Sequence, residues 1–176
     1  RDRVTFAMMI GIPMLQLVLF GFAINSNPKH LPTAVYAADN SPFSRTIVWA
    51  LRNSSYFDIT HEAKSAAEIQ TLLAENQIQF AVTVPVDFSR KLLRGEQPDL
   101  LLEADATDPS AVGFAMSALN ALTTSVLNRD LIGPLTPLRA GSTPFNIISH
   151  QHYNPESITQ YNIVPGLTGV MLTMTL

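Results

Sequence analysis

His150 and His152 stand two positions apart, and imidazoles at this separation are candidate metal ligands. In a β-strand such residues point to the same face, so both rings would be able to bind one ion. Zn²⁺ sites in proteins use at least three protein ligands, and no third ligand is evident from the sequence. We therefore interpret the pair as part of an exposed strand, and predict neither a metal site nor a bound cofactor.

Asp105 and Asp108 form a second candidate, because paired carboxylates serve acid–base catalysis. Asp108 is followed by Pro109 and Ser110, which is typical of a helix start, so we interpret the two residues as a turn and a helix cap. The sequence contains no Gly-rich phosphate loop, no G-x-S-x-G and no H-E-x-x-H motif. It also contains no cysteine, which excludes thiolate metal sites and a Cys nucleophile. We predict no catalytic residue and no enzyme activity in this chain.

A helix expected over residues 111–128 carries no charged residue. Its apolar stripe is formed by Val112, Met116, Leu119, Leu122 and Val126. The opposite face carries Ser117, Asn120, Thr124 and Asn128, so the pattern predicts an amphipathic surface helix and not a membrane span. Charged residues are depleted at the centres of protein interfaces, because an unpaired buried charge is costly. We predict that this neutral stripe contacts a partner protein.

The elements that position these residues alternate along the chain. Apolar runs at 33–38, 57–61, 79–84, 100–104 and 145–149 are typical of strands. Helices are expected from Pro42, after the S-x-x-E capping box that begins at Ser65, from Asp87 to Arg94, and over 111–128. The alternation predicts an α/β domain with a largely parallel or mixed sheet.

Charge is scarce and unevenly placed. Only 14% of the 176 residues are charged, against about 25% in a typical soluble domain. Residues 4–28 and 157–176 carry no charge, whereas residues 25–160 hold 9 Lys and Arg against 13 Asp and Glu. The net charge of −3 argues against binding of nucleic acid, which requires a basic surface.

The neutral ends predict membrane helices. Residues 4–24 would rise about 31 Å as a helix, close to the thickness of the hydrocarbon core of a bilayer. We assign residues 1–25 to a first transmembrane helix, 26–160 to an extracytoplasmic α/β domain, and 161–176 to the start of a second, truncated helix. Arg1 and Arg3 place the cytoplasm on the N-terminal side by the positive-inside rule.

Six short motifs carry a resemblance to a known family. The chain begins with R-D-R and continues with I-P-M-L-Q-L-V-L-F-G-F-A-I-N over 12–25, A-V-T-V-P-V-D-F-S-R-K-L-L-R-G over 81–95, D-A-T-D-P-S over 105–110, Y-N-P-E over 153–156 and V-P-G-L over 164–167. In this order they resemble the permease subunits of type-2 ATP-binding-cassette (ABC) exporters, in the subfamily with a large extracytoplasmic domain after the first membrane helix. In that family V-P-G-L opens a block of five more membrane helices. The ATPase-coupling residues belong to that block and have no counterpart here.

The resemblance implies a multi-pass permease of the bacterial inner membrane that exports drugs or other small amphipathic compounds. Such permeases pair as homo- or heterodimers in membrane lipid and dock a separate ATP-binding subunit that hydrolyses the ATP. In Gram-negative bacteria they often work with a periplasmic membrane-fusion adaptor. The alternative is the extracytoplasmic sensory region of a membrane receptor or kinase, which shares the layout of helix, outer domain and helix.

Overall fold

The computed structural model describes residues 10–11, 14–15, 18, 29–138 and 143–153. Within them the α/β domain contains, in chain order, β1 (Leu31–Ala37), α2 (Pro42–Asn53), β2 (Phe57–Glu62), α3 (Ala66–Ala74), β3 (Phe80–Val84), α4 (Phe88–Leu93), β4 (Asp99–Asp105), α5 (Pro109–Thr123), the 3₁₀ helices η1 (Val126–Arg129) and η2 (Gly133–Leu138), and β5 (Asn146–His152). The predicted alternation of strands and helices is confirmed.

The five strands form one mixed sheet in the order β2-β1-β3-β4-β5. β1 pairs in parallel with both β2 and β3, β4 runs antiparallel to β3, and β5 runs parallel to β4. The chain therefore crosses over β1 on its way from β2 to β3 by way of α3. This arrangement confirms the predicted mixed α/β sheet.

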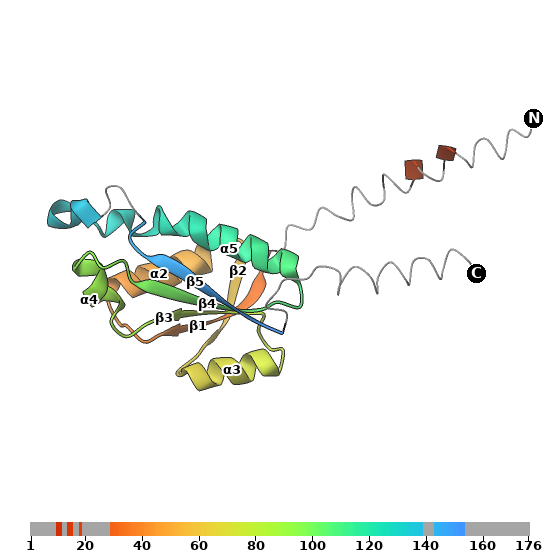
Figure 1. Cartoon of the computed structure of the whole chain (residues 1–176), viewed down its shortest axis with the longest axis horizontal. Coiled ribbons are helices and arrows are strands. Elements are labelled where there is room, and N and C mark those ends of the chain that lie inside the picture. The colour runs from red at the N-terminus through yellow and green to blue at the C-terminus, as the bar shows by residue number, and fades with distance from the viewer. Residues whose placement is uncertain (1–9, 12–13, 16–17, 19–28, 139–142, 154–176) are drawn as a thin grey trace, which may run out of the picture.

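The helices cover the two faces of the sheet unequally (Figure 1). The larger hydrophobic cluster packs residues of α2, α4 and α5, such as Leu51, Phe88 and Val112, on one face. On the other face α3 lies alone, and its Ile69 and Leu73 pack against the small Ala34 and Ala81 of β1 and β3. α3 contacts β1 and β3, whereas Ile148 and His150 of the edge strand β5 are exposed.

Three of the four helix starts form as the sequence predicts. The Ser41 side chain accepts a hydrogen bond from the Ser44 amide at 3.2 Å, with Pro42 in the first turn of α2. The Ser65 side chain accepts from the Glu68 amide at 3.2 Å, and Asp108 caps α5. Such caps satisfy backbone N–H groups that have no partner inside the helix.

The cap predicted at Asp87 is wrong. Its side chain makes no capping hydrogen bond, and instead lies 3.5 Å from Arg90 Nη2 and Lys91 Nζ. The carboxylate of Asp39, in the loop between β1 and α2, accepts a hydrogen bond from the Ser89 amide in the first turn of α4 at 2.6 Å. The first turn of α4 is therefore capped from a distant loop. The prediction that Gly95 ends this helix is confirmed, because Gly95 follows the C-cap residue Arg94 and has a φ of +74°.

The predicted membrane helices lie almost entirely outside the described residues. Of the first, the structure describes Ile10, Gly11, Met14, Leu15 and Val18, which are helical and exposed. The segment 161–176 is not described. Among the described residues, one helix, Pro109–Arg129, is long and apolar enough to cross a membrane by length and composition. Its α5 part packs on the sheet, which is the arrangement expected of a core helix.

Candidate functional site

Helix α5 is shorter than predicted and turns a different line of residues to the sheet. It ends at Thr123, so Asn128 lies in η1 and not in α5. Its buried residues are mostly small: Ala111, Val112, Ala115, Ala118, Leu119 and Thr123. Met116, Leu122 and Val126, predicted as core, are only partly buried. The hydrophobic periodicity predicted the correct side of the helix. The residues closest to the sheet nevertheless include the small alanines of that side, whereas the larger Met116 and Leu122 lie at its edge.

The predicted polar stripe is largely exposed. Ser117, Asn120 and Thr124 face solvent, and Asn128 is half-buried. The Ser117 hydroxyl donates to the Gly113 carbonyl at 2.9 Å, and the Thr124 hydroxyl donates to the Ala121 carbonyl at 3.0 Å. A hydroxyl group that donates a hydrogen bond to a carbonyl of its own helix does not require water or a partner protein as an acceptor. Two of the exposed polar groups are thus bonded within the helix, and the stripe carries no charge.

A groove that the sequence analysis missed adjoins this stripe. Trp49 of α2 is 64% exposed, although it is the only tryptophan in the chain. A cavity of about 640 Å³ lies beside it. It is lined by Arg45, Thr46, Trp49 and Ala50 of α2, by Leu122 of α5, and by Val126 and Arg129 of η1 with the flanking Ser125 and Asp130. The signal in the sequence was a tryptophan outside the apolar stripe of its helix. Exposed tryptophan and arginine are the residue types that most often anchor a protein partner.

Asp39 is the described group whose ionisation is most altered by its surroundings. Burial raises the pKa of Asp39, but hydrogen bonds from Ser89 and Ser41 outweigh this effect and hold the pKa below its ordinary value. The Ser41 amide donates to Oδ1 at 2.9 Å and the Ser89 amide to Oδ2 at 2.6 Å. A carboxylate fixed by two backbone amides joins two loops, and this geometry indicates a structural role.

The two predicted carboxylates do form a turn and a cap. Asp105 Oδ1 accepts hydrogen bonds from the amide and the hydroxyl of Thr107, and Asp108 Oδ1 accepts from the Ser110 amide at 2.9 Å. Both side chains are thus engaged in local backbone structure, and the interpretation given to them from the sequence is confirmed.

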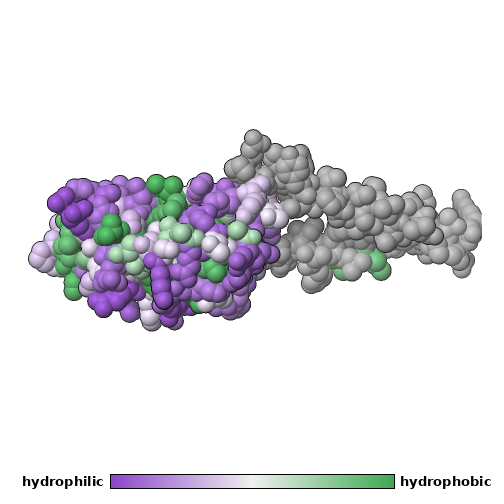
Figure 2. Space-filling model, turned by 90° about the horizontal axis from the view of Figure 1, so that it is seen from below, coloured by the Kyte–Doolittle hydropathy of each residue, from purple (hydrophilic) through white to green (hydrophobic). Residues whose placement is uncertain are grey.

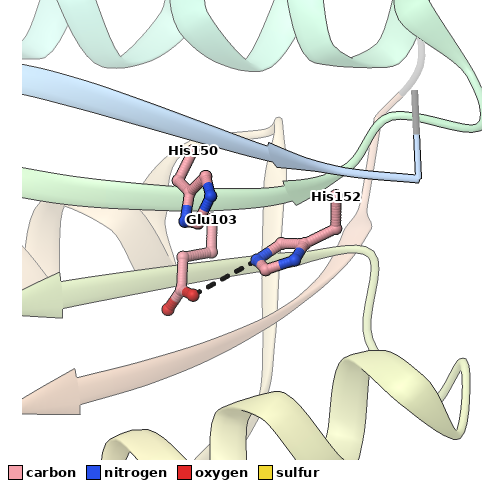
Figure 3. A group of neighbouring side chains, drawn as sticks. All are labelled: Glu103, His150 and His152. Carbon is pink, nitrogen blue, oxygen red and sulfur yellow. Dashed lines mark hydrogen bonds and ion pairs between the residues drawn. The ribbon is translucent and has the colours of Figure 1, made fainter. Parts of the chain in front are cut away.

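The histidine pair has a neighbour that the sequence did not reveal. β5 extends to His152, and Glu103 of β4 lies directly opposite His150 in the sheet. Glu103 Oε1 lies 3.3 Å from His152 Nε2, and it accepts a hydrogen bond from Gln70 Nε2 of α3 at 2.5 Å. Figure 3 shows the three side chains gathered on one side of β4 and β5. They lie on the sheet face that also carries α3, where Glu103 is buried, His152 half-buried and His150 exposed.

Comparison with known proteins gives a consistent result. The sequence profile of the ABC-2 family transporter protein matches residues 3–176. The probable multidrug ABC transporter permease YbhR of Escherichia coli K12 is 25% identical over 174 residues, which are 99% of this chain and 46% of that protein. YbhS of the same strain, which carries the same description, is 21% identical over 181 residues. The chain thus spans about half the length of these curated relatives.

Two further matches cover parts of the chain. The inner membrane transport permease YhhJ of E. coli K12 is 30% identical over 131 residues, which are 66% of this chain and 34% of that protein. A crystal structure of a domain of a putative ABC type-2 transporter from Thermotoga maritima aligns with a TM-score of 0.58 and 20% identity, covering 76% of this chain and 99% of that one. At this identity the likeness shows the fold alone.

Proposed function

Since this chain belongs to the ABC-2 family of transporter proteins, we propose that it supplies the first membrane helix and the extracytoplasmic α/β domain of an exporter permease. The observation that carries the proposal is the extent of the family match, which runs unbroken from residue 3 through the α/β domain to residue 176. It includes both apolar ends as well as the described domain. A sensory region would share the layout but not this family, so the permease is the better supported function.

The proposed cargo is a drug or another small amphipathic compound, moved out of the cytoplasm. The support is the description of YbhR and YbhS as probable multidrug permeases, at 25% and 21% identity. The proposed location is the bacterial inner membrane, and the support is the description of YhhJ as an inner membrane transport permease.

The permease would not hydrolyse ATP itself. A separate ATP-binding subunit would supply the energy, and a second permease subunit would complete the transport path through the membrane lipid. A periplasmic adaptor of the membrane-fusion type is the third proposed partner. These partners follow from the kind of transporter to which the family belongs, and not from a contact in the structure.

The α/β domain offers one surface suited to such a partner. We assign it to the exposed face of α5, with Ser117, Asn120 and Thr124, together with the adjoining groove at Trp49. The α5 face carries no charge, so covering it would not bury an unpaired ion. Trp49 would supply the large apolar contact that interface centres favour.

ATP-driven uptake of ethidium into inverted inner-membrane vesicles tests both proposals. The vesicles contain the intact permease and its ATP-binding subunit, and we expect uptake that requires ATP. Replacing Asn120 and Thr124 together by Lys should leave the domain folded, since exposed substitutions change stability by only about 0.5 kcal/mol. It should nevertheless reduce assembly and uptake by at least about tenfold, because two lysines would have to be buried without partners.

In the matched control, Thr71 and Ala74 of α3 are both replaced by Lys. These two residues are also exposed and share one helix face. This variant should transport as the native protein does. Normal assembly and uptake by the Asn120/Thr124 variant would show that the α5 face is ordinary solvent-exposed surface. Vesicles in which no amphipathic dye accumulates with ATP would refute the exporter function.

A further inference from the structure

We propose that Glu103, His150 and His152 form a binding site for Zn²⁺ on the sheet face that carries α3. One candidate ligand atom from each residue can be chosen so that all three lie within 4.8 Å of one another. The site is independent of the transport function, because it rests on side-chain geometry in the described domain alone.

The strand register brings the three ligands together. Parallel pairing sets Glu103 opposite His150 and Asp105 opposite His152. Because side chains alternate across a strand, Glu103, His150 and His152 all point to the same face. That face is the one on which α3 lies, and α3 does not extend over β5 (Figure 1). His150 is exposed, so an ion can approach the three side chains from the side of β5.

The distance between two of the ligand atoms matches that of a zinc site. Two ligands that bind Zn²⁺ at about 2.0–2.1 Å with a tetrahedral angle between them lie about 3.3 Å apart. Glu103 Oε1 and His152 Nε2 are already separated by 3.3 Å. His150 is exposed, so its imidazole is free to rotate into the third position. The backbone need not move, because the sheet already holds both strands in register.

The surroundings of the Glu103 carboxylate favour a bound cation. Glu103 is only 5% exposed, and a buried carboxylate requires a compensating charge or hydrogen bonds. Gln70 Nε2 donates to Glu103 Oε1 from α3, which fixes the orientation of the carboxylate. Outer hydrogen bonds of this kind orient the ligands in established metal sites.

A simple ion pair between His152 and Glu103 explains only part of this arrangement. It leaves no role for His150, whose ring centroid lies 4.7 Å from that of His152. A metal ion bound by both imidazoles would give both rings a function.

The ligand set indicates the metal. Two imidazoles and one carboxylate match the His₂Glu sites in which Zn²⁺ keeps a fourth position for water. The exposure of His150 leaves room for that water. The ion would link the edge strand β5 to β4, and β5 is the strand that leads toward the predicted second membrane helix. The expected role is to stabilise the attachment of that strand.

Calorimetric titration of the metal-free protein with ZnCl₂ tests this proposal. The intact permease is purified in detergent through a tag without histidine and treated with a chelator. We expect one Zn²⁺ per chain, together with a rise in the unfolding temperature on zinc addition. E103Q, H150A and H152A should each weaken Zn²⁺ binding by at least about tenfold. Q70A removes a hydrogen bond to a ligand, and should also weaken binding by about tenfold or more.

H61A is the matched control, because His61 is a half-buried histidine in β2 of the same sheet, away from the three ligands. It should bind Zn²⁺ as the native protein does. H150A decides the question even if E103Q fails to fold, since His150 is exposed and its side chain makes no hydrogen bond within the described part of the chain. Native affinity in H150A, or no stoichiometric binding by the native protein, would overturn the proposal and leave an ion pair only.

Discussion

Asp39 shows how a single side chain joins two elements that are far apart in the sequence. It accepts hydrogen bonds from the amide of Ser41 before α2 and from that of Ser89 in α4, 50 residues away. Its side chain thus supplies the cap that Asp87 does not. In the sequence, Asp39 belongs to the segment D-N-S-P, which is typical of a turn. No rule of sequence spacing predicts its hydrogen bond with the distant Ser89.

Asp39→Asn should destabilise the domain by about 1–3 kcal/mol, because one amide donor loses its acceptor in a site only 8% exposed. The folded-state pKa of Asp39 lies below its ordinary value, so its contribution is present above the unfolded-state pKa of about 3.9. The contribution is lost as the pH falls through the lower folded-state pKa. Thermal unfolding of the detergent-solubilised chain between pH 3 and pH 7, followed by circular dichroism, measures this effect.

The control for this prediction is Asp58→Asn, because Asp58 is exposed in β2. This change should alter neither the stability at neutral pH nor its acid dependence. If Asp39→Asn were as stable as the native chain at pH 7, the carboxylate would not hold the two loops together.

Glu103 marks the limit of sequence reasoning about the candidate site. The histidine spacing correctly indicated two rings on one strand face, but the third ligand lies in β4, 49 residues before His152. Only the parallel pairing of β4 with β5 brings it there, and pairing partners are set by tertiary packing. Local pattern cannot supply such a neighbour.

At the scale of elements, the sequence pattern predicted which helices and strands exist and their order along the chain. Caps at Ser41, Ser65 and Asp108 are short-range features, so they can be read directly. The burial of α5 was harder to predict, because Ala115 and Ala118 look neutral in a hydrophobic pattern although both pack on the sheet. The sheet order was not predictable, since it depends on the crossover of the chain past β1.

A matched pair of leucine substitutions tests whether α5 is a core helix and not a membrane span. Ala115 is fully buried in the main hydrophobic cluster, so Ala115→Leu should destabilise the domain by about 1–3 kcal/mol through overpacking. Ala121→Leu, on the exposed side of the same helix, should change stability by no more than about 0.5 kcal/mol. Thermal unfolding of both variants checks the difference. Equal tolerance at both positions would fit a helix that faces lipid.

At the scale of the whole molecule, the described domain and the neutral ends of the sequence give one arrangement. The α/β domain contains 9 of the 11 Lys and Arg residues between two apolar stretches. The charge distribution leads to the prediction of a membrane helix at each end, because a bilayer excludes charge over a length that can be counted in residues. The surface of the domain on the side of α3 is mostly hydrophilic, with separate apolar patches, as expected of a domain in water (Figure 2).

The central claim is that the α/β domain lies outside the cytoplasm, and side-specific labelling of position 64 tests it most directly. Lys64 is exposed just before α3, and these 176 residues contain no cysteine. Lys64→Cys, placed in a cysteine-free version of the intact permease, should react with a membrane-impermeant maleimide in cells whose inner membrane is intact. Arg3→Cys, at the N-terminal end of the first predicted membrane helix, should react only after that membrane is disrupted. Labelling of position 64 only after disruption would contradict the account.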